Sequence, residues 1–272
     1  IVCVHSENRH LVRRATQQVK DLKGDSANII DWSDTHPNMA EEEAVIRLSY
    51  LAEKSGVPVY LVHISSSDAI NRIRKIKPFN KYLNIETTSP YLSITKHSMT
   101  DNTIKMEPPF RDYEDVEELW KAVEDGIVDT IGTDNVTLSK DEKNINSTLW
   151  NAIPGYPALE THLPVLLHEG VIKRGIAIES IIEKITKTPA KTFGMYPMKG
   201  SMLPGSDADI VIIDLNKTKE ILPGNLSSRS DFSLYSGKNI QGWPVTTIKA
   251  GKIVVQDDKF IGQSIRGKCI ER

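Results

Sequence analysis

The chain has 272 residues, a formal net charge of −2 and 39% hydrophobic residues. This length suits one large domain or two smaller ones, and the near-neutral charge argues against a nucleic-acid or anionic-membrane partner. No apolar run approaches the roughly 18 residues of a membrane helix, and Cys3 and Cys269 are too few for a disulfide framework. We therefore expect a cytoplasmic protein with a small-molecule partner.

The first quarter of the chain alternates apolar and amphipathic segments. Residues 1–5, "IVCVH", form an apolar run typical of a buried strand. The run stands at the very start, without Met or a signal-peptide layout, so we expect that an N-terminal part is absent. The segments that follow predict a helix over 7–22, a loop over 31–38 and a helix over 39–56 that has Val45, Leu48, Leu51 and Ala52 on its buried face and ends at Gly56.

The same alternation continues to about residue 195 without any sign of hairpins. Strand and helix patterns in alternation are typical of a parallel sheet with covering helices, so the expected class is α/β. Ser67 or Asp68 is the expected N-cap of the helix over 67–77. The patterns predict strands over 57–65, 82–86 and 127–135, and helices over 67–77, 112–126, 156–171 and 177–195.

The pattern changes after Met195. Short β runs separated by Gly and Asp turns follow, among them "GSDADIVIIDL" and "VTTIKAGKIVVQDDKFIG". We expect a domain boundary near Pro197, with 1–196 forming an α/β barrel region and 197–272 forming part of a small β unit.

Three of the predicted strands end on a good metal ligand. "IVCVH" ends on His5, "VYLVH" on His63 and "DTIGTD" on Asp134. The carboxyl ends of strands in a parallel β/α barrel meet at one face, and two imidazoles with a carboxylate suit zinc or a similar divalent ion. A histidine at a strand end is more often a hydrogen-bonded structural residue, and the Asp of "TDN" is often a cap. The pattern by itself leaves both interpretations open.

An ordered set of motifs then points to a family. The chain resembles the cyclic amidohydrolases of the amidohydrolase superfamily, namely dihydroorotase, dihydropyrimidinase (hydantoinase) and allantoinase. This resemblance implies the C-terminal half of a metal-dependent (β/α)8 TIM-type barrel, then part of a small β-sandwich. The intact protein would open a cyclic amide or ureide ring and form a homo-oligomer. The motifs are "VHSEN", "VHISSSDA", "ETTSPYL", "KMEPPFR", "GTDN", "IPGYPALETHLPVLL" and "TPAKTFGMYPMKGSMLPGSDADIVIIDL".

The resemblance also implies roles for the three strand-end residues. His5 and His63 match two ligands of the second of two metals, commonly zinc, and Asp134 matches the carboxylate that touches the first metal and acts as general acid/base. The remaining family ligands, an H-x-H pair and a carboxylated lysine, lie upstream in the family and are missing from this sequence. We expect the 272-residue chain by itself to be inactive.

The expected substrate contacts are Glu107, Leu138 and Gly155. In dihydroorotases a histidine that helps hold the substrate carboxylate stands where this chain has Leu138, so a neutral hydantoin, dihydropyrimidine or allantoin ring is favoured over dihydroorotate. Arg111 could still bind such a carboxylate. Glu107 and Gly155 match positions where the family binds the ring amide partly through the backbone, although Glu107 could equally be a solvated loop residue.

A non-catalytic alternative exists within the same superfamily. Some relatives keep the fold, lose metal ligands and act as scaffold or assembly proteins. The presence of His5, His63 and Asp134 argues for the enzyme.

Overall fold

The computed structural model describes residues 1–98, 100–262, 267 and 269–270. The chain divides into two compact units. Unit 1 comprises Ile1–His162 and Ile221–Lys238, and unit 2 comprises Leu163–Glu220 and Asn239–Arg272. The boundary near Pro197 concerns the domains of the family and stays a prediction.

Unit 1 contains a four-stranded parallel sheet. Its order is β1-β2-β3-β4, and the register pairs Val2 with Val59, Val59 with Leu83 and Glu86 with Thr130. Because all four strands run in one direction, their carboxyl ends share one edge of the sheet. The expected parallel α/β arrangement is confirmed. The strands are β1 (Val2–Val4), β2 (Val59–Leu61), β3 (Leu83–Thr88) and β4 (Thr130–Gly132).

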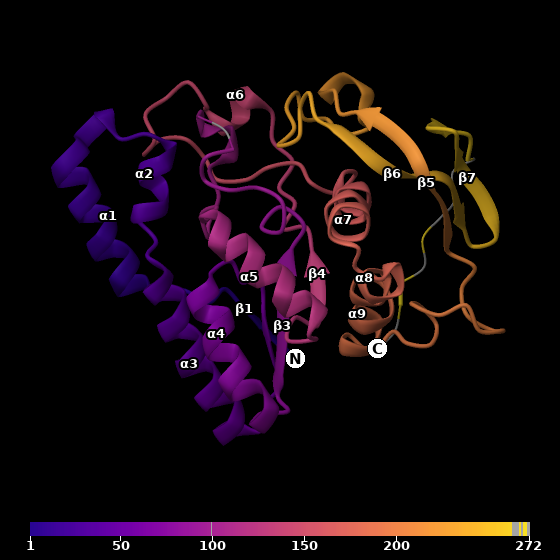
Figure 1. The fold of residues 1–272 in the computed structure, drawn as a ribbon, viewed down its shortest axis with the longest axis horizontal. Helices are drawn as coiled ribbons and strands as arrows, with labels where there is room; N and C mark the ends of the chain where they lie inside the picture. The colour runs from indigo at the N-terminus through magenta and orange to yellow at the C-terminus, as the bar shows by residue number, and fades with distance from the viewer. Residues whose placement is uncertain (99, 263–266, 268, 271–272) are drawn as a thin grey trace. The chain divides into compact units, whose positions relative to one another are not determined.

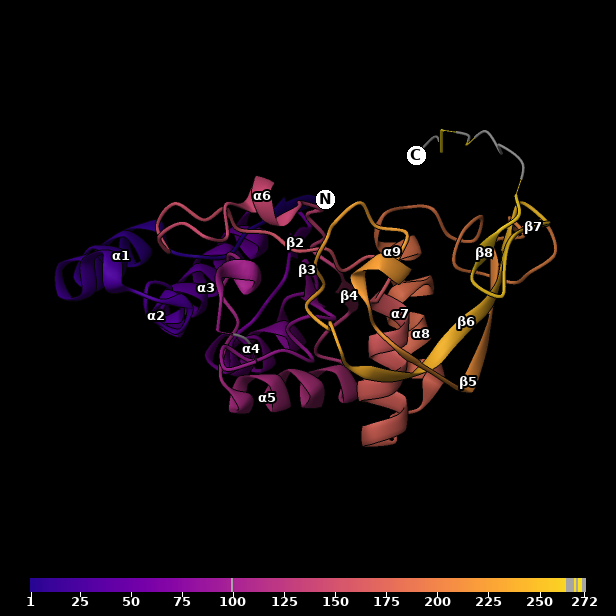
Figure 2. The same ribbon diagram turned by 90° about the horizontal axis from the view of Figure 1, so that it is seen from above.

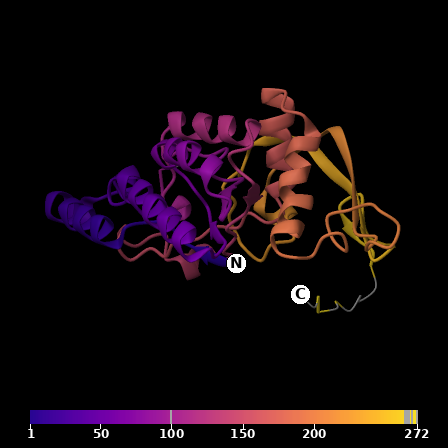
Figure 3. The same ribbon diagram turned by 90° about the horizontal axis from the view of Figure 1, so that it is seen from below.

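Three amphipathic helices lie side by side on one side of these strands (Figure 1). Helix α3 (Asn38–Ser55) buries Ala44 and Val45 and ends at Gly56, whose φ of 68° is the left-handed conformation that glycine adopts easily. Helices α4 (Ser67–Ile76) and α5 (Tyr113–Glu124) pack next to it in turn. Figure 3 shows these helices from below.

Three local expectations need correction. Part of the expected loop 31–38 is helical, because the Asn28 side chain and the Asp31 carboxylate form a capping box that starts α2 (Ile29–Asp34). The N-cap of α4 is Ser66, whose hydroxyl accepts a hydrogen bond from the Ala69 amide at 3.3 Å. Leu51, expected on the buried face of α3, is 52% exposed.

The remaining elements of unit 1 are shorter, apart from α1 (Arg9–Lys23). They are η1 (Gly24–Ser26), η2 (Lys77–Phe79), η3 (Asn102–Ile104), α6 (Lys140–Lys143) and η5 (Pro223–Asn225).

Unit 2 pairs helices with an antiparallel sheet of order β5-β6-β7-β8, drawn from orange to yellow in Figure 2. Gly242 of β6 lies so close to Leu167 that a Cβ atom on it would stand 2.9 Å from the Leu167 Cβ. The β-strands expected after Met195 are confirmed. A complete β-sandwich stays a proposal. The elements are α7 (His162–Leu166), the π-helical η4 (Leu167–Ile172), α8 (Ile178–Ile185), α9 (Lys187–Thr192), β5 (Ile210–Glu220), β6 (Asn239–Lys249), β7 (Lys252–Gln256) and β8 (Lys259–Phe260).

Across the described residues, none of the helices combines the length and the apolar character needed to span a bilayer.

Candidate functional site

The backbone turns sharply where two of the strands end. His63 follows β2 with a φ of 44°, and Asp134 follows β4 with a φ of 48°. Residues other than glycine seldom adopt positive φ, and such strain is concentrated at functional sites. Two of the three residues that sequence analysis selected as ligands, His63 and Asp134, are therefore held in strained conformations by the surrounding fold.

The structure brings His5 and His63 together. The Nδ1 atom of His5 lies 3.1 Å from the Nε2 atom of His63, and the ring centroids are 4.8 Å apart. Two nitrogens bound to one tetrahedral zinc at roughly 2.0–2.1 Å would lie about 3.3 Å apart. The two imidazoles thus already have the spacing of two ligands of one ion.

Glu7 orients the His5 ring. Its Oε2 atom lies 2.9 Å from the outer ring nitrogen, Nε2 of His5, and the Glu7 side chain is 4% exposed. Metal-binding histidines usually donate their second N–H to a carboxylate or carbonyl, which fixes the ring. Sequence analysis missed Glu7, although residues two apart in an extended segment share a face, so its place in "VHSEN" was a usable signal.

The pKa values of the two histidines are shifted in opposite directions. Burial lowers the pKa of His5, but the hydrogen bond and the negative charge of Glu7 outweigh burial and leave the pKa raised. Burial, with a smaller contribution from the charge of His5, lowers the pKa of His63 to about 4. His63 is thus neutral at physiological pH, the form in which imidazole binds metals.

Asp134 offers a buried oxygen that has no hydrogen-bond partner among the described residues. Its Oδ2 atom is buried and unpaired, and burial raises the pKa of this carboxyl against the opposing charge of His5. An unpaired buried polar atom is costly, so it marks a place where a ligand, ion or proton is expected. Asn135 serves the loop instead, since its Oδ1 atom accepts from the Ala158 and Leu159 amides at 2.9 and 3.2 Å.

These donors fit part of a metal site. His5 Nδ1, His63 Nε2 and the orphaned Asp134 Oδ2 are a borderline-to-hard donor set that suits zinc. Within the residues that the structure describes, no three His, Cys, Asp or Glu side chains are already arranged around one point as a metal site. The residues therefore suit a divalent ion as part of a ligand set.

Glu41 of α3 anchors the segment that follows His63. Its fully buried carboxylate accepts hydrogen bonds from the amides of Ser65 at 3.0 Å and Ser66 at 2.8 Å, and from both hydroxyls. Burial raises the pKa of Glu41, and Arg111 opposes this rise. Sequence analysis missed this role because nothing local links the first turn of α3 to the end of β2.

Arg111 is committed to the same region. It is 3% exposed, donates from Nε to the Ser65 hydroxyl at 3.1 Å, and also donates to the His36 carbonyl. Its Nη2 atom lies 3.9 Å from Glu7. These contacts hold the Arg111 guanidinium in place, and its Nη2 atom is buried without a hydrogen-bond partner among the described residues.

A second buried carboxyl, Glu86 of β3, lies between the predicted ligands. It accepts a hydrogen bond from the His63 amide at 3.3 Å, and burial raises its pKa to about 7, with Asp134 adding to the rise. Gly132 leaves room for it, because a Cβ atom there would overlap the Glu86 carboxylate. Sequence analysis treated Glu86 only as the end of a strand.

The predicted substrate residues have unequal surroundings. Glu107 is exposed, and among the described residues its backbone amide and carbonyl have no hydrogen-bond partner. Leu138 is half-buried, and its side chain would lie 3.5 Å from a Cβ atom at Gly155. Gly155 has a φ of 133°, and a Cβ atom there would stand 2.9 Å from the Val136 Cβ, so the position requires glycine.

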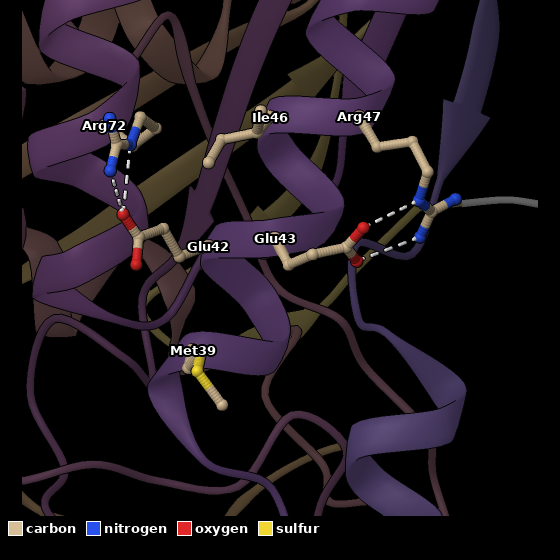
Figure 4. Close-up of a pocket in the computed structure, with 6 residues that line it drawn as sticks. All are labelled: Met39, Glu42, Glu43, Ile46, Arg47 and Arg72. Atoms are coloured by element: carbon tan, nitrogen blue, oxygen red, sulfur yellow. Dashed lines mark hydrogen bonds and ion pairs between the residues drawn. The ribbon is translucent and has the colours of Figure 1, made fainter.

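A surface hollow on α3 and α4 has no free charge to offer a ligand (Figure 4). Glu42 pairs with Arg72 at 2.6 Å and Glu43 pairs with Arg47 at 3.1 Å. This hollow is therefore a weaker candidate than the strand ends.

The chain is similar to several known proteins. The chain is 29% identical to an L-hydantoinase of Paenarthrobacter aurescens over 279 residues, covering 100% of this chain and 60% of that protein. It is 31% identical to a D-phenylhydantoinase of Escherichia coli over 244 residues, covering 88% of this chain and 53% of that protein. A dihydropyrimidinase structure from Brevibacillus agri NCHU1002 superposes with a TM-score of 0.90 at 28% identity, covering 96% of this chain and 58% of that one.

The chain thus spans between 53% and 60% of the length of these relatives. The resemblance to the hydantoinase and dihydropyrimidinase group is confirmed. Residues 111–254, more than half of the chain, match the profile described as "Amidohydrolase family". The chain therefore belongs to the amidohydrolase family.

Proposed function

We propose that this chain supplies one side of the active site of a metal-dependent hydrolase that opens a cyclic amide or ureide ring of the hydantoin or dihydropyrimidine type. The observation that carries the proposal is the 3.1 Å pairing of His5 Nδ1 with His63 Nε2, with the outer nitrogen of His5 held by Glu7. The L-hydantoinase and D-phenylhydantoinase similarities supply the substrate class. Both relatives carry enzyme names, so no comparison supports the scaffold alternative.

In this proposal His5, His63 and Asp134 hold divalent metal, with zinc as the expected ion and two ions per intact protein. When bound, such an ion makes water more acidic and polarises a carbonyl group. His5 and His63 contribute neutral nitrogens, and Glu7 keeps the His5 ring in one orientation.

Asp134 is the proposed general acid/base. Its buried, unpaired Oδ2 atom and raised pKa suit a carboxylate that accepts a proton and gives it up again. Hydrolysis breaks the bond between the ring carbonyl carbon and the ring nitrogen, and the leaving nitrogen needs one proton. We infer that Asp134 takes this proton from the attacking water and delivers it to that nitrogen.

The surroundings of the substrate positions favour a neutral ring. Leu138 cannot bind a carboxylate, whereas Arg111 donates to Ser65 and His36 and keeps only Nη2 without a partner among the described residues. An unpaired carboxylate forgoes a charge-assisted hydrogen bond of about 1.5–3 kcal/mol, which corresponds to roughly 10- to 100-fold in affinity. The free backbone groups of Glu107 remain available for the ring amide.

The test is a side-by-side ring-opening assay of the intact protein that contains this chain, with added zinc. We expect hydantoin, dihydrouracil or allantoin to be opened with a kcat/KM about 10- to 100-fold above that for dihydroorotate. Asp134→Asn should lower kcat by about 100-fold or more, while the exposed His97→Ala should match wild type. A preference for dihydroorotate would contradict the substrate class, and full activity of Asp134→Asn would contradict the mechanism.

A further inference from the structure

Two lysines are buried beneath the loop of residues 149–155. Lys105 is 3% exposed and Lys143 is 0% exposed. Lysine is almost never fully buried unless its ammonium group is paired. In the part of the chain that the structure describes, the hydrogen-bond partners of both ammonium groups are backbone carbonyls and no carboxylate. Their buried charge must therefore be stabilised by other groups.

Backbone carbonyls of the loop provide that stabilisation. Lys143 Nζ donates to the carbonyls of Lys105 at 2.8 Å, Ile153 at 2.9 Å and Gly155 at 2.6 Å, which uses all three of its N–H groups. Lys105 Nζ donates to the Leu149 and Ala152 carbonyls at 2.8 and 2.6 Å. The loop thus directs its carbonyls inward, toward two cations.

The Gly155 peptide is the part of the loop held most closely. Its amide donates to the Lys105 carbonyl at 3.0 Å, and its own carbonyl accepts from Lys143. Lys143 also donates to the Lys105 carbonyl. One ammonium group therefore contacts both the Gly155 carbonyl and the carbonyl that accepts the hydrogen bond of the Gly155 amide. A carbonyl oxygen has two lone pairs, so the Gly155 oxygen can still accept one further hydrogen bond.

We propose that Lys143 is a positioning residue for substrate recognition, whose ammonium group fixes the Gly155 carbonyl in the orientation that accepts the ring N–H of a cyclic ureide. This inference rests on the proposed function and on the expectation that the backbone of Gly155 contacts the ring amide. It adds a residue that does not touch the substrate but acts through a peptide that does. Lys105 supports the preceding turn of the same loop.

Electrostatics adds a pH dependence to this geometry. Burial, with help from the charge of Lys105, lowers the pKa of Lys143 to about 7, opposed by Asp101. Burial lowers the pKa of Lys105 to about 8, with Glu107 opposing and Lys20 reinforcing the shift. A neutral amine has two N–H groups, so Lys143 must release one of its three carbonyls when it loses its proton. Ring recognition should therefore weaken as the pH rises through about 7.

The experiment compares Lys143→Met with Lys140→Met on the same helix, because Lys140 is exposed. For hydantoin, Lys143→Met should raise KM at least about 10-fold, the effect of a shift of about 1.4 kcal/mol. Its kcat should stay within about threefold, and the pH dependence of KM above 7 should disappear. Lys140→Met should match wild type in all three respects. Amide hydrogen exchange at Gly155 should be at least about 10-fold faster in Lys143→Met alone.

The outcomes separate this inference from the proposed function. An intact wild-type protein, containing this chain, that opens no cyclic ureide would overturn the proposed function, and this inference with it. The wild type could be active while Lys143→Met keeps the wild-type KM, even with faster amide exchange at Gly155. That result would show that Lys143 is purely structural, and it would overturn this inference alone. If Lys143→Met does not fold, the wild-type pH series decides, because a KM that stays flat from pH 6 to 9 contradicts the proposal.

Discussion

Glu41→Ala should destabilise the chain far more than a neighbouring charge removal does. The Glu41 carboxylate accepts four hydrogen bonds from Ser65 and Ser66, two of them from backbone amides at 3.0 and 2.8 Å. The hydroxyls can rotate to other partners, but the two buried amides cannot. At about 1–3 kcal/mol for each orphaned donor, we expect a loss of roughly 2–6 kcal/mol in the free energy of unfolding.

Urea denaturation followed by fluorescence of the buried Trp32 and Trp120 measures this loss. The matched control is Glu42→Ala, one residue along α3, where a partly exposed ion pair with Arg72 should contribute about 1 kcal/mol or less. Glu41→Gln keeps one acceptor oxygen and should fall between the two. Glu41→Ala within about 0.5 kcal/mol of Glu42→Ala would refute the anchoring role, because no buried amide would then have been orphaned.

Three further predictions test the loop and the substrate positions. Between about pH 7 and 9 the stability should rise, because the pKa of Lys143 is lowered to about 7 in the folded chain and the unfolded lysine, with a pKa near 10.4, binds more protons there; urea midpoints should show a smaller rise in Lys143→Met, where Lys105 with its pKa of about 8 still contributes, and an unchanged slope would contradict it. Gly155→Asn should lower stability by about 1–3 kcal/mol in thermal unfolding, because its φ of 133° is strained and its Cβ would meet Val136; an unchanged Tm would show that the loop relaxes. Leu138→His should raise kcat/KM for dihydroorotate at least about 10-fold relative to hydantoin, and an unchanged ratio would remove Leu138 from the argument.

Local patterns were enough to predict the main elements. The apolar runs before His5, His63 and Asp134 end where the strands do, because strand ends depend on the local change from apolar to polar residues. The amphipathic period and Gly56 predicted α3. Helix α2 was missed because its start depends on one side-chain exchange between Asn28 and Asp31, whereas the surrounding composition resembles a loop.

The supporting residues of the site were harder to find for a physical reason. Glu41 accepts hydrogen bonds from backbone amides that lie 24 and 25 residues away in the sequence. Lys143 donates to backbone carbonyls that lie 10 to 38 residues away. Such contacts arise only after the sheet and its loops have packed, so no periodic pattern reports them. Glu7 is the exception, since it lies two residues from His5 and on the same face of an extended segment.

The most direct test of the central claim is a cobalt(II) titration of the chain, monitored by visible absorption. If His5 and His63 bind one ion, His5→Ala and His63→Ala should each weaken cobalt binding by at least about 10-fold, the size of effect known from removing even supporting groups at metal sites. His97→Ala, which alters an exposed histidine paired with Asp112, should bind cobalt as wild type does. Equal binding by all four proteins would contradict the claim that the ends of β1 and β2 form a metal site.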